Sequence, residues 1–358
     1  MHMADALLSP AVAVTMYAAS AAAAGVSLVQ LRREELAAPE TAKKKLPTMA
    51  VMSALVFAGQ MINYTIPGTG SSGHLCGGML LSAMLGPWAG FLSMIVILAI
   101  QALFFADGGL LALGANVWNM AFYGCFVGYF LIYRPLMRGN LSAGKARLRL
   151  TLASVLGCVA TLQLGAFSVV LETTASGISA LPFAQFVELM LPIHLAIGVV
   201  EGLATAAIVI FISKAQPSLL RPADLETGPV KKASFTVLGI FAVAALLCGA
   251  ALSWFASAYP DGLEWSVAGV TGSEETSLAE PSSLHRSLES VQASTAIMPD
   301  YALPAAEETA SSGETERASS IVNPETSLAG VLGSVIIAAL VFAAGFLFGR
   351  KPHSHCPR

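Results

Sequence analysis

The first two residues, Met1 and His2, carry the nitrogen atoms of a tridentate metal chelate. A free terminal amine, the deprotonated backbone nitrogen of His2 and its ring nitrogen nearest the backbone can close two adjoining rings in one plane. One more nitrogen donor would complete a square. That arrangement suits Ni(II) or Cu(II), whereas Zn(II) prefers a tetrahedron and Mg(II) prefers oxygen ligands. The alternative is that His2 has no role in metal binding, because any histidine this early in a chain would give the same set of nitrogens.

His74 is a second candidate, because it follows the Gly/Ser-rich stretch 67–73 and begins a short apolar run. Glycine lets the backbone fold inward, and irregular backbone is tolerated at membrane depth only where it is buried in protein or lines a cavity. An ionisable group there is costly without a partner. Either His74 is functional, or it forms a structural hydrogen bond with a neighbouring helix.

His194 and Glu201 form a third candidate pair, seven residues apart and therefore on one helix face. Gly198 and Gly202 beside them allow close helix packing. The pair fits a role in transmitting metal occupancy to the other helices, and it fits a structural hydrogen bond between helices equally well.

The composition around these residues is that of an integral membrane protein. Of the 358 residues, 55% are hydrophobic and 11% are charged, with a mean hydropathy of +0.71. Soluble domains carry about 25% charged residues. This excludes a soluble multidomain enzyme. The five cysteines have no paired spacing, so no disulfide framework is expected.

Nine apolar runs predict an all-α fold of nine transmembrane or membrane-inserted helices, since one crossing takes about 20 apolar residues. The run 74–85 is too short to span and is expected to enter part-way and turn at Gly86-Pro87. The run 6–31 is interpreted as a retained helix rather than a signal peptide. The nine runs are 6–31, 46–66, 74–85, 87–106, 110–133, 150–171, 186–213, 233–257 and 327–349.

The positive charges predict the orientation of these helices. Of the 19 lysines and arginines, 17 follow the first, fifth, seventh and ninth runs. Because basic residues concentrate in cytoplasmic connections, the N-terminus is expected outside the cell and the C-terminus inside.

The composition also divides the chain. Residues 1–214 form a seven-helix domain, 215–232 a cytoplasmic linker, 233–349 a two-helix domain and 350–358 a cytoplasmic tail. Within the two-helix domain, the extracytoplasmic segment 258–326 holds 12 acidic and 2 basic residues. Its composition predicts that it is mostly disordered and that metal binding does not need it.

Five runs of the sequence are distinctive when they are taken together. They are Met1-His2-Met3-Ala4-Asp5, Gly73-His74-Leu75-Cys76-Gly77-Gly78, Asp107-Gly108-Gly109-Leu110, His194 to Gly202 and Pro260-Asp261-Gly262-Leu263-Glu264. With the first four runs, residues 1–214 resemble the substrate-binding membrane component (CbiM/NikM family) of energy-coupling-factor nickel/cobalt transporters. With the fifth run, the second part resembles the small two-helix PDGLE-type subunit (NikN/CbiN-like) of the same transporters, fused here in one chain.

The resemblance implies an N-terminus that folds back into the helix bundle. It implies a metal site made of the Met1 amine, the backbone and ring nitrogens of His2, and the ring of His74. Ni²⁺ or Co²⁺ would be the transported substrate. Nickel is preferred because a deprotonated amide in a planar set stabilises Ni(II); the alternative is cobalt uptake that supplies cobalamin synthesis.

The family also implies partners and a location. A separate transmembrane coupling (T) component and cytoplasmic ATPase subunits would drive transport across a bacterial or archaeal cell membrane, and no nucleic acid is involved. The stretch 139–145 has the spacing of a phosphate-binding loop, but Ala146 replaces the required Ser or Thr, so the chain is not expected to hydrolyse ATP.

Two other function classes fit less well. A membrane metalloenzyme would need an open metal position beside a general base, which the four-nitrogen set does not offer. A channel or secondary transporter would be expected to show an internal repeat, and the sequence has none. The pair His353 and His355 with Cys356 could chelate metal, but it lies on the opposite side of the membrane in the predicted topology.

Overall fold

A computed structural model describes residues 1–37, 39–138, 143–216, 235–273, 281–303 and 324–348, together with residues 220 and 278. Most of the predicted linker 215–232, part of the stretch 139–145 and the whole tail 350–358 lie outside the described residues.

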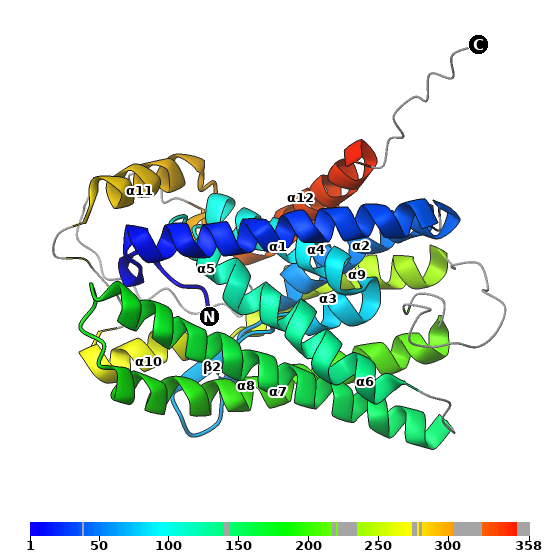
Figure 1. The fold of residues 1–358 in the computed structure, drawn as a ribbon, viewed down its shortest axis with the longest axis horizontal. Coiled ribbons are helices and arrows are strands. Elements are labelled where there is room, and N and C mark those ends of the chain that lie inside the picture. The colour runs from blue at the N-terminus through cyan, green and yellow to red at the C-terminus, as the bar shows by residue number, and fades with distance from the viewer. Residues whose placement is uncertain are drawn as a thin grey trace, which may run out of the picture.

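Long helices lie side by side along the longest axis of the molecule (Figure 1). Most of them contain an apolar stretch of at least 18 residues, and large apolar side chains such as Val14 and Leu131 remain exposed on their outer surfaces. Such surfaces are stable only against lipid. The long helices are α1 (Pro10–Ala37), α2 (Pro39–Gln60), α4 (Pro87–Phe104), α7 (Ala143–Ser176), α8 (Phe183–Ala215) and a continuous stretch made of α5 (Leu113–Asn116), η2 (Val117–Tyr133) and α6 (Arg134–Met137).

Each of the nine predicted runs contains a helix in the structure, and six helices among the described residues are long and apolar enough to cross a membrane. The multi-pass all-α class is therefore confirmed. The division into seven and two spanning helices stays a prediction, because α2, α3 and α9 are not among these six.

The short helix α3 (Gly78–Leu85) ends at the predicted turn into α4, while its insertion part-way into the membrane stays a prediction. Gly86 joins them with a φ of 82°, a conformation that glycine adopts without strain, and Pro87 then begins α4. A Cβ on Gly90 would lie 3.0 Å from the backbone nitrogen of Ser82, so the two helices pack closely.

The second part of the chain packs against α2. Its helices α9 (Phe235–Ala250) and α12 (Pro324–Phe348) approach each other at Gly249 and Gly330, where a Cβ on Gly330 would lie 2.3 Å from the Gly249 carbonyl oxygen. A Cβ on Gly333 would lie 2.2 Å from the ring of Phe57 on α2. Small residues let apolar helices meet in lipid, so the two parts form one helical body.

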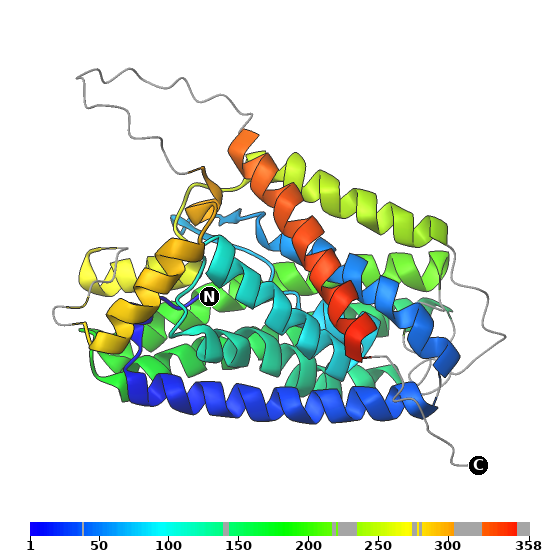
Figure 2. The same ribbon diagram turned by 90° about the horizontal axis from the view of Figure 1, so that it is seen from above.

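The prediction of disorder in the acidic segment is wrong for its described residues. They contain α10 (Gly262–Thr271), α11 (Ser283–Thr295) and the turn η6 (Pro299–Tyr301). Figure 2 shows α11 crossing the same end of the bundle as the N-terminus. Composition suggested a solvated chain, but specific polar contacts tether the segment. His285 Nε2 lies 3.0 Å from the Leu8 carbonyl, and Gln292 donates to the carbonyls of Ala102 (2.9 Å) and Gly108 (2.8 Å).

A two-stranded hairpin precedes α3. Strand β1 (Tyr64–Ile66) pairs antiparallel with β2 (Ser71–Gly73), with Tyr64 opposite Gly73. A Cβ on Gly73 would lie 2.5 Å from Ile197 Cγ1 on α8, so the end of β2 lies directly against that helix. The hairpin thus places His74 between the helices, where its side chain is buried.

Candidate metal site

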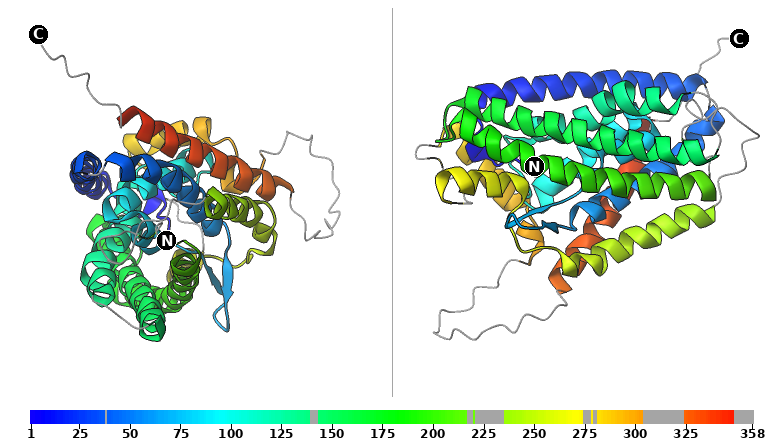
Figure 3. Two further views of the ribbon diagram at one scale, coloured as in Figure 1. Left: turned by 90° about the vertical axis from the view of Figure 1, so that its right-hand side faces the viewer. Right: turned by 90° about the horizontal axis from the view of Figure 1, so that it is seen from below.

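The N-terminal segment lies inside the ring of helices rather than on the surface (Figure 3). Asn116 holds it by accepting from the Met3 amide (2.7 Å) and donating to the Met3 carbonyl (3.2 Å). Gly109 also donates its amide to the Met3 carbonyl (2.9 Å), and Asp5 accepts from the Ala112 amide (2.9 Å). These contacts fix the position of Met1 and His2 without using their own nitrogen atoms.

The loop that holds this segment requires glycine. Gly108 has a φ of 81°, and a Cβ there would lie 3.3 Å from the Cβ of His2. A Cβ on Gly109 would lie 1.8 Å from Asp5 Oδ1, a distance that no structure tolerates. The run Asp107-Gly108-Gly109 is therefore a cradle for the N-terminus.

The segment after His74 is clamped from two helices. Glu201 on α8 accepts from the amides of Cys76 and Gly77, each at 2.9 Å. Gln60 at the end of α2 donates to the Cys76 carbonyl at 2.8 Å. These contacts satisfy the backbone of a buried turn and fix where the His74 ring lies.

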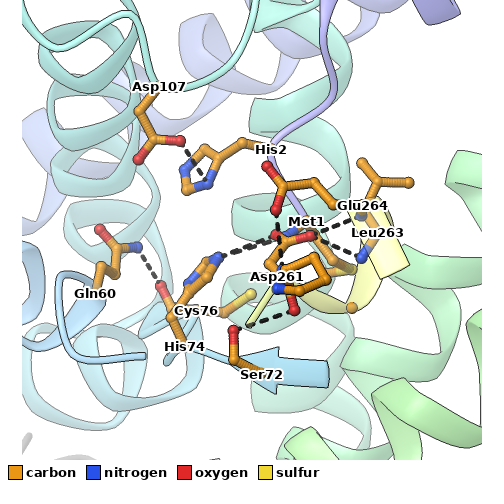
Figure 4. Close-up of polar contacts among 12 residues, drawn as sticks. Met1, His2, Gln60, Ser72, His74, Cys76, Asp107, Asp261, Leu263 and Glu264 are labelled. Carbon is orange, nitrogen blue, oxygen red and sulfur yellow. Dashed lines mark hydrogen bonds and ion pairs between the residues drawn. The ribbon is translucent and has the colours of Figure 1, made fainter. Parts of the chain in front are cut away.

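The structure brings Met1, His2 and His74 together (Figure 4). The Met1 amine nitrogen lies 3.4 Å from His74 Nε2, and the rings of His2 and His74 stack with centroids 5.2 Å apart. Met1 is 4% exposed and His74 is 8% exposed, so water has little access to these two residues, whereas His2 is partly exposed.

In this structure, however, two of the nitrogen donors face carboxylates. The Met1 amine forms an ion pair with Asp261 Oδ2 at 2.8 Å, and His2 Nδ1 lies 3.2 Å from Asp107 Oδ1. The described residues contain no group of three or more His, Cys, Asp or Glu side chains placed to hold a metal ion. A metal site here would have to use main-chain nitrogens together with the two rings.

Asp261 reaches the site from the second part of the chain. Its Oδ1 caps α10 by accepting from the amides of Leu263 (2.8 Å) and Glu264 (2.9 Å), and Glu264 accepts from the Asp261 amide (3.0 Å) in return. This capping box leaves Oδ2 free to face Met1 and, at 3.8 Å, His74.

The hairpin holds Asp261 in place. The Ser72 amide on β2 donates to the Pro260 carbonyl at 2.8 Å, and its hydroxyl donates to the Tyr259 carbonyl at 2.7 Å. The same hairpin therefore presents His74 from one end and fixes Asp261 beside it.

Comparison with known proteins identifies the family. The family described as the cobalt uptake substrate-specific transmembrane region (CbiM) matches residues 2–219, and the PDGLE domain matches residues 235–350. The chain belongs to the CbiM family. Its second part carries the PDGLE domain, as the resemblance predicted.

The similarity extends over both domains in at least one relative. A protein of Archaeoglobus fulgidus named as a fused nickel transport protein, NikMN, is 34% identical, over 96% of this chain and 97% of the relative. The fused nickel transport protein NikMN of Rhodobacter capsulatus is 33% identical, over 64% of this chain and 66% of the relative. A crystal structure of a transition metal transporter is similar with a TM-score of 0.50 and 33% identity, over 60% of this chain and 93% of that chain.

In this member of the CbiM family, burial and neighbouring charges determine which of the groups around His2 and His74 carry a proton. Burial lowers the pKa of the Met1 amine, but the neighbouring carboxylate of Asp261 outweighs it, and the pKa is raised overall. Burial would likewise raise the pKa of Asp261, but the ammonium group and His74 hold it well below its usual value. Burial lowers the pKa of His2 to about 4, so its ring is neutral at physiological pH. A neutral ring is the form that binds metal.

A cavity of about 810 Å³ opens beside His2 and His74. Its lining within the described chain includes no lysine or arginine but six carboxylates, those of Asp5, Asp107, Asp261, Glu264, Glu289 and Asp300. A one-signed lining raises the local concentration of cations. The cavity therefore favours the approach of a metal ion to the two rings.

The structure separates the roles of His194 and Glu201. Both are 1% exposed, but Glu201 binds the turn after His74, while His194 Nδ1 faces the Met190 carbonyl at 2.7 Å. Its Nε2 has no hydrogen-bond partner among the described residues and lies under Gly262 of the PDGLE domain, where a Cβ would be 3.3 Å away. Glu201 thus holds the turn that follows His74, whereas His194 makes no such contact with that turn among the described residues.

Sequence reasoning missed Asp261, Asp107, Gln60 and Gln101 as neighbours of the site. The Asp261-x-x-Glu264 spacing predicts a capping box, but nothing local predicts which group its second oxygen meets. Gln60 and Gln101 lie in apolar runs. A side-chain amide in such a run needs a hydrogen-bond partner from elsewhere in the fold, and this need is the signal that the sequence offers.

Proposed function

We propose that this chain captures Ni²⁺ for an ATP-driven energy-coupling-factor uptake transporter, with residues 1–214 binding the ion and with α10 and α11 of the second part lying beside the site. The observation that carries the proposal is the 3.4 Å approach of the Met1 amine to His74 Nε2, beside a stacked His2 ring. This is the donor set that a planar four-nitrogen site needs.

The ion would be bound by the Met1 amine, the His2 backbone nitrogen, His2 Nδ1 and His74 Nε2. Binding requires the amine to lose its proton and leave Asp261, and it requires the His2 backbone amide to lose its proton as well. Nδ1 must also turn from Asp107 toward the ion. The contacts of Asn116 and Glu201 hold the rest of both segments while these nitrogens move.

The metal is proposed to be nickel. The relatives from Archaeoglobus and Rhodobacter are fused nickel transport proteins, and four nitrogens in a plane suit Ni(II) better than Zn(II). Cobalt is the second candidate, because the family is described by cobalt uptake. A cobalt importer of this kind would supply cobalamin synthesis.

Transport would need further subunits. Ala146 follows Lys145 where a phosphate-binding loop has Ser or Thr, so ATP hydrolysis is assigned to separate cytoplasmic subunits joined through a transmembrane coupling component. The chain itself is a binding component without enzyme activity. It lies in a bacterial or archaeal cell membrane with Met1 outside, which the positions of the basic residues favour.

Equilibrium titration tests the proposal. The purified full chain, with Met1 as its first residue, is titrated with Ni(II), Co(II) and Zn(II), and the absorption spectrum is recorded. We expect Ni(II) to bind most tightly of the three, with the spectrum of a planar nitrogen site. Zn(II) binding as tight as Ni(II), or an octahedral Ni(II) spectrum, would contradict the proposed site.

A further inference from the structure

A chain of buried amides connects His2 with the turn after His74. Gln60 Nε2 donates to the Cys76 carbonyl at 2.8 Å, and Gln101 Nε2 donates to Gln60 Oε1 at 3.1 Å. His2 Nε2 lies 3.2 Å from Gln101 Oε1. Gln60 is 5% exposed and Gln101 is fully buried, so these contacts are shielded from water.

The orientation of the two side-chain amides is fixed at the Cys76 end of this hydrogen-bonded series. The Cys76 carbonyl can only accept, so Gln60 must turn its NH₂ group toward it and its oxygen toward Gln101. Gln101 must then offer its own NH₂ group to Gln60, which leaves its oxygen facing His2. An oxygen acceptor there requires a proton on His2 Nε2.

We infer that Gln60 and Gln101 are positioning residues that hold His2 in the tautomer with hydrogen on Nε2 and a free lone pair on Nδ1. This inference rests on the proposed function, because Nδ1 is the ring nitrogen that closes the chelate with the His2 backbone. Partners that fix the tautomer of a metal-binding histidine commonly lie in such a second layer.

Asp107 favours the opposite tautomer, because its Oδ1 lies 3.2 Å from Nδ1 and could accept a hydrogen there. That tautomer would make Gln101 turn its NH₂ group toward His2, and Gln60 would then have to point its oxygen at the Cys76 carbonyl. Two acceptors would face each other at the 2.8 Å contact. The anchored amides therefore oppose Asp107, and the Nδ1 lone pair beside this carboxylate is left for a cation.

Nitrogen NMR of the metal-free full chain, with ¹⁵N-labelled histidine rings at mildly alkaline pH, reads the tautomer directly. The His2 signals are identified by their loss in His2→Phe. Two other histidines calibrate the spectrum, because the carbonyl of Met190 requires hydrogen on His194 Nδ1 and the carbonyl of Leu8 requires it on His285 Nε2. Unchanged signals from these two also report an intact fold in each variant.

Two variants distinguish tautomer control by Gln60 and Gln101 from simple packing of these side chains. Wild-type His2 should carry hydrogen on Nε2. Gln60→Met leaves the contact between Gln101 and His2 but removes its anchor, so hydrogen should move to Nδ1, with about tenfold weaker Ni(II) binding. Adding Gln101→Glu to Gln60→Met restores an acceptor that needs no anchor, so the double variant should recover the Nε2 tautomer.

Hydrogen on Nδ1 of wild-type His2, or a tautomer that Gln60→Met leaves unchanged, would overturn the inference. Failure of the proposed function has a different signature, namely Ni(II) binding that His2→Ala leaves intact. The metal-free spectra are independent of that result.

Discussion

At the scale of single residues, His74 is proposed to supply the fourth nitrogen donor. Its Nε2 lies 3.4 Å from the Met1 amine. His74→Ala should leave the tridentate chelate of Met1 and His2 but remove the fourth donor. We expect Ni(II) binding to weaken by more than about a hundredfold, because the loss of a residue that only orients a ligand already weakens binding by about 10- to 100-fold. The absorption spectrum should change as well. His285→Ala, on α11, is the matched control and should keep the spectrum.

Asp261 gives the site a pH dependence. Despite burial, this carboxylate keeps the pKa of the Met1 amine raised, so the amine is protonated at neutral pH and must lose a proton to bind metal. Ni(II) affinity should therefore rise with pH, more steeply below the pKa of the amine than above it, because the His2 backbone amide also releases a proton when the ion binds. Asp261→Asn removes the negative charge, lowers the pKa of the amine and should move this change of slope to lower pH.

Binding titrations across the pH range check this prediction. Asp300→Asn is the control, because Asp300 lines the same cavity without contacting the amine. An identical pH profile in wild type and Asp261→Asn would show that the ion pair does not control loading.

The sequence predicts Met1, His2 and His74 as ligands, and the structure places the three residues together, whereas their neighbours could not be predicted. A terminal Met-His pair has chelate geometry within two adjacent residues, so it can be seen without a fold. Asp261 lies 260 positions from Met1, and its contact depends on how α10 docks on β2. Local pattern carries no information about such a contact.

At the scale of elements, the Asp107-Gly108-Gly109 loop must leave room for the N-terminal segment. Gly109→Ala would place a methyl group 1.8 Å from Asp5 Oδ1 and displace the segment. Ni(II) binding should fall by at least about tenfold, because a displacement of about 1 Å already breaks a preorganised site. The long helices that make up most of the fold should be unaffected.

Gly25→Ala in α1 is the matched control, since a Cβ there meets nothing within 4 Å. It should leave Ni(II) binding unchanged and slightly stabilise the helix. Equal affinities for Gly109→Ala and wild type, measured by the same titration, would contradict the role of the cradle.

Helix positions followed from apolar runs, but the ordered acidic segment did not. Runs such as 87–106 predict α4 within two residues at each end, because a membrane helix needs continuous apolar sequence. The order of α11 comes instead from contacts of His285 and Gln292 with distant backbone carbonyls. Composition reports average solvation and cannot predict such tethers.

For the whole molecule, the orientation in the membrane is the first prediction. The N-terminus and α11 lie at one end of the bundle (Figure 2), and residues of both segments line the cavity. The positions of the basic residues predict that this end lies outside the cell. A cysteine at the exposed residue Ser290 of α11 should react with a membrane-impermeant reagent added to intact cells. A cysteine at Ser142 should react only after the membrane is opened. The reverse pattern would invert the topology.

The central claim is that the terminal amine and His2 together bind the ion. It requires the fold of the whole molecule to bring both groups within reach of His74. Inserting one alanine between Met1 and His2 keeps every side chain but enlarges the chelate and moves the amine by up to about 3.5 Å. Titration of this variant with Ni(II), beside the native chain with a free Met1 amine, is the most direct test. We predict that the insertion abolishes tight binding and the planar nitrogen spectrum. Unchanged affinity with an unchanged spectrum would show that the terminal amine is not a ligand.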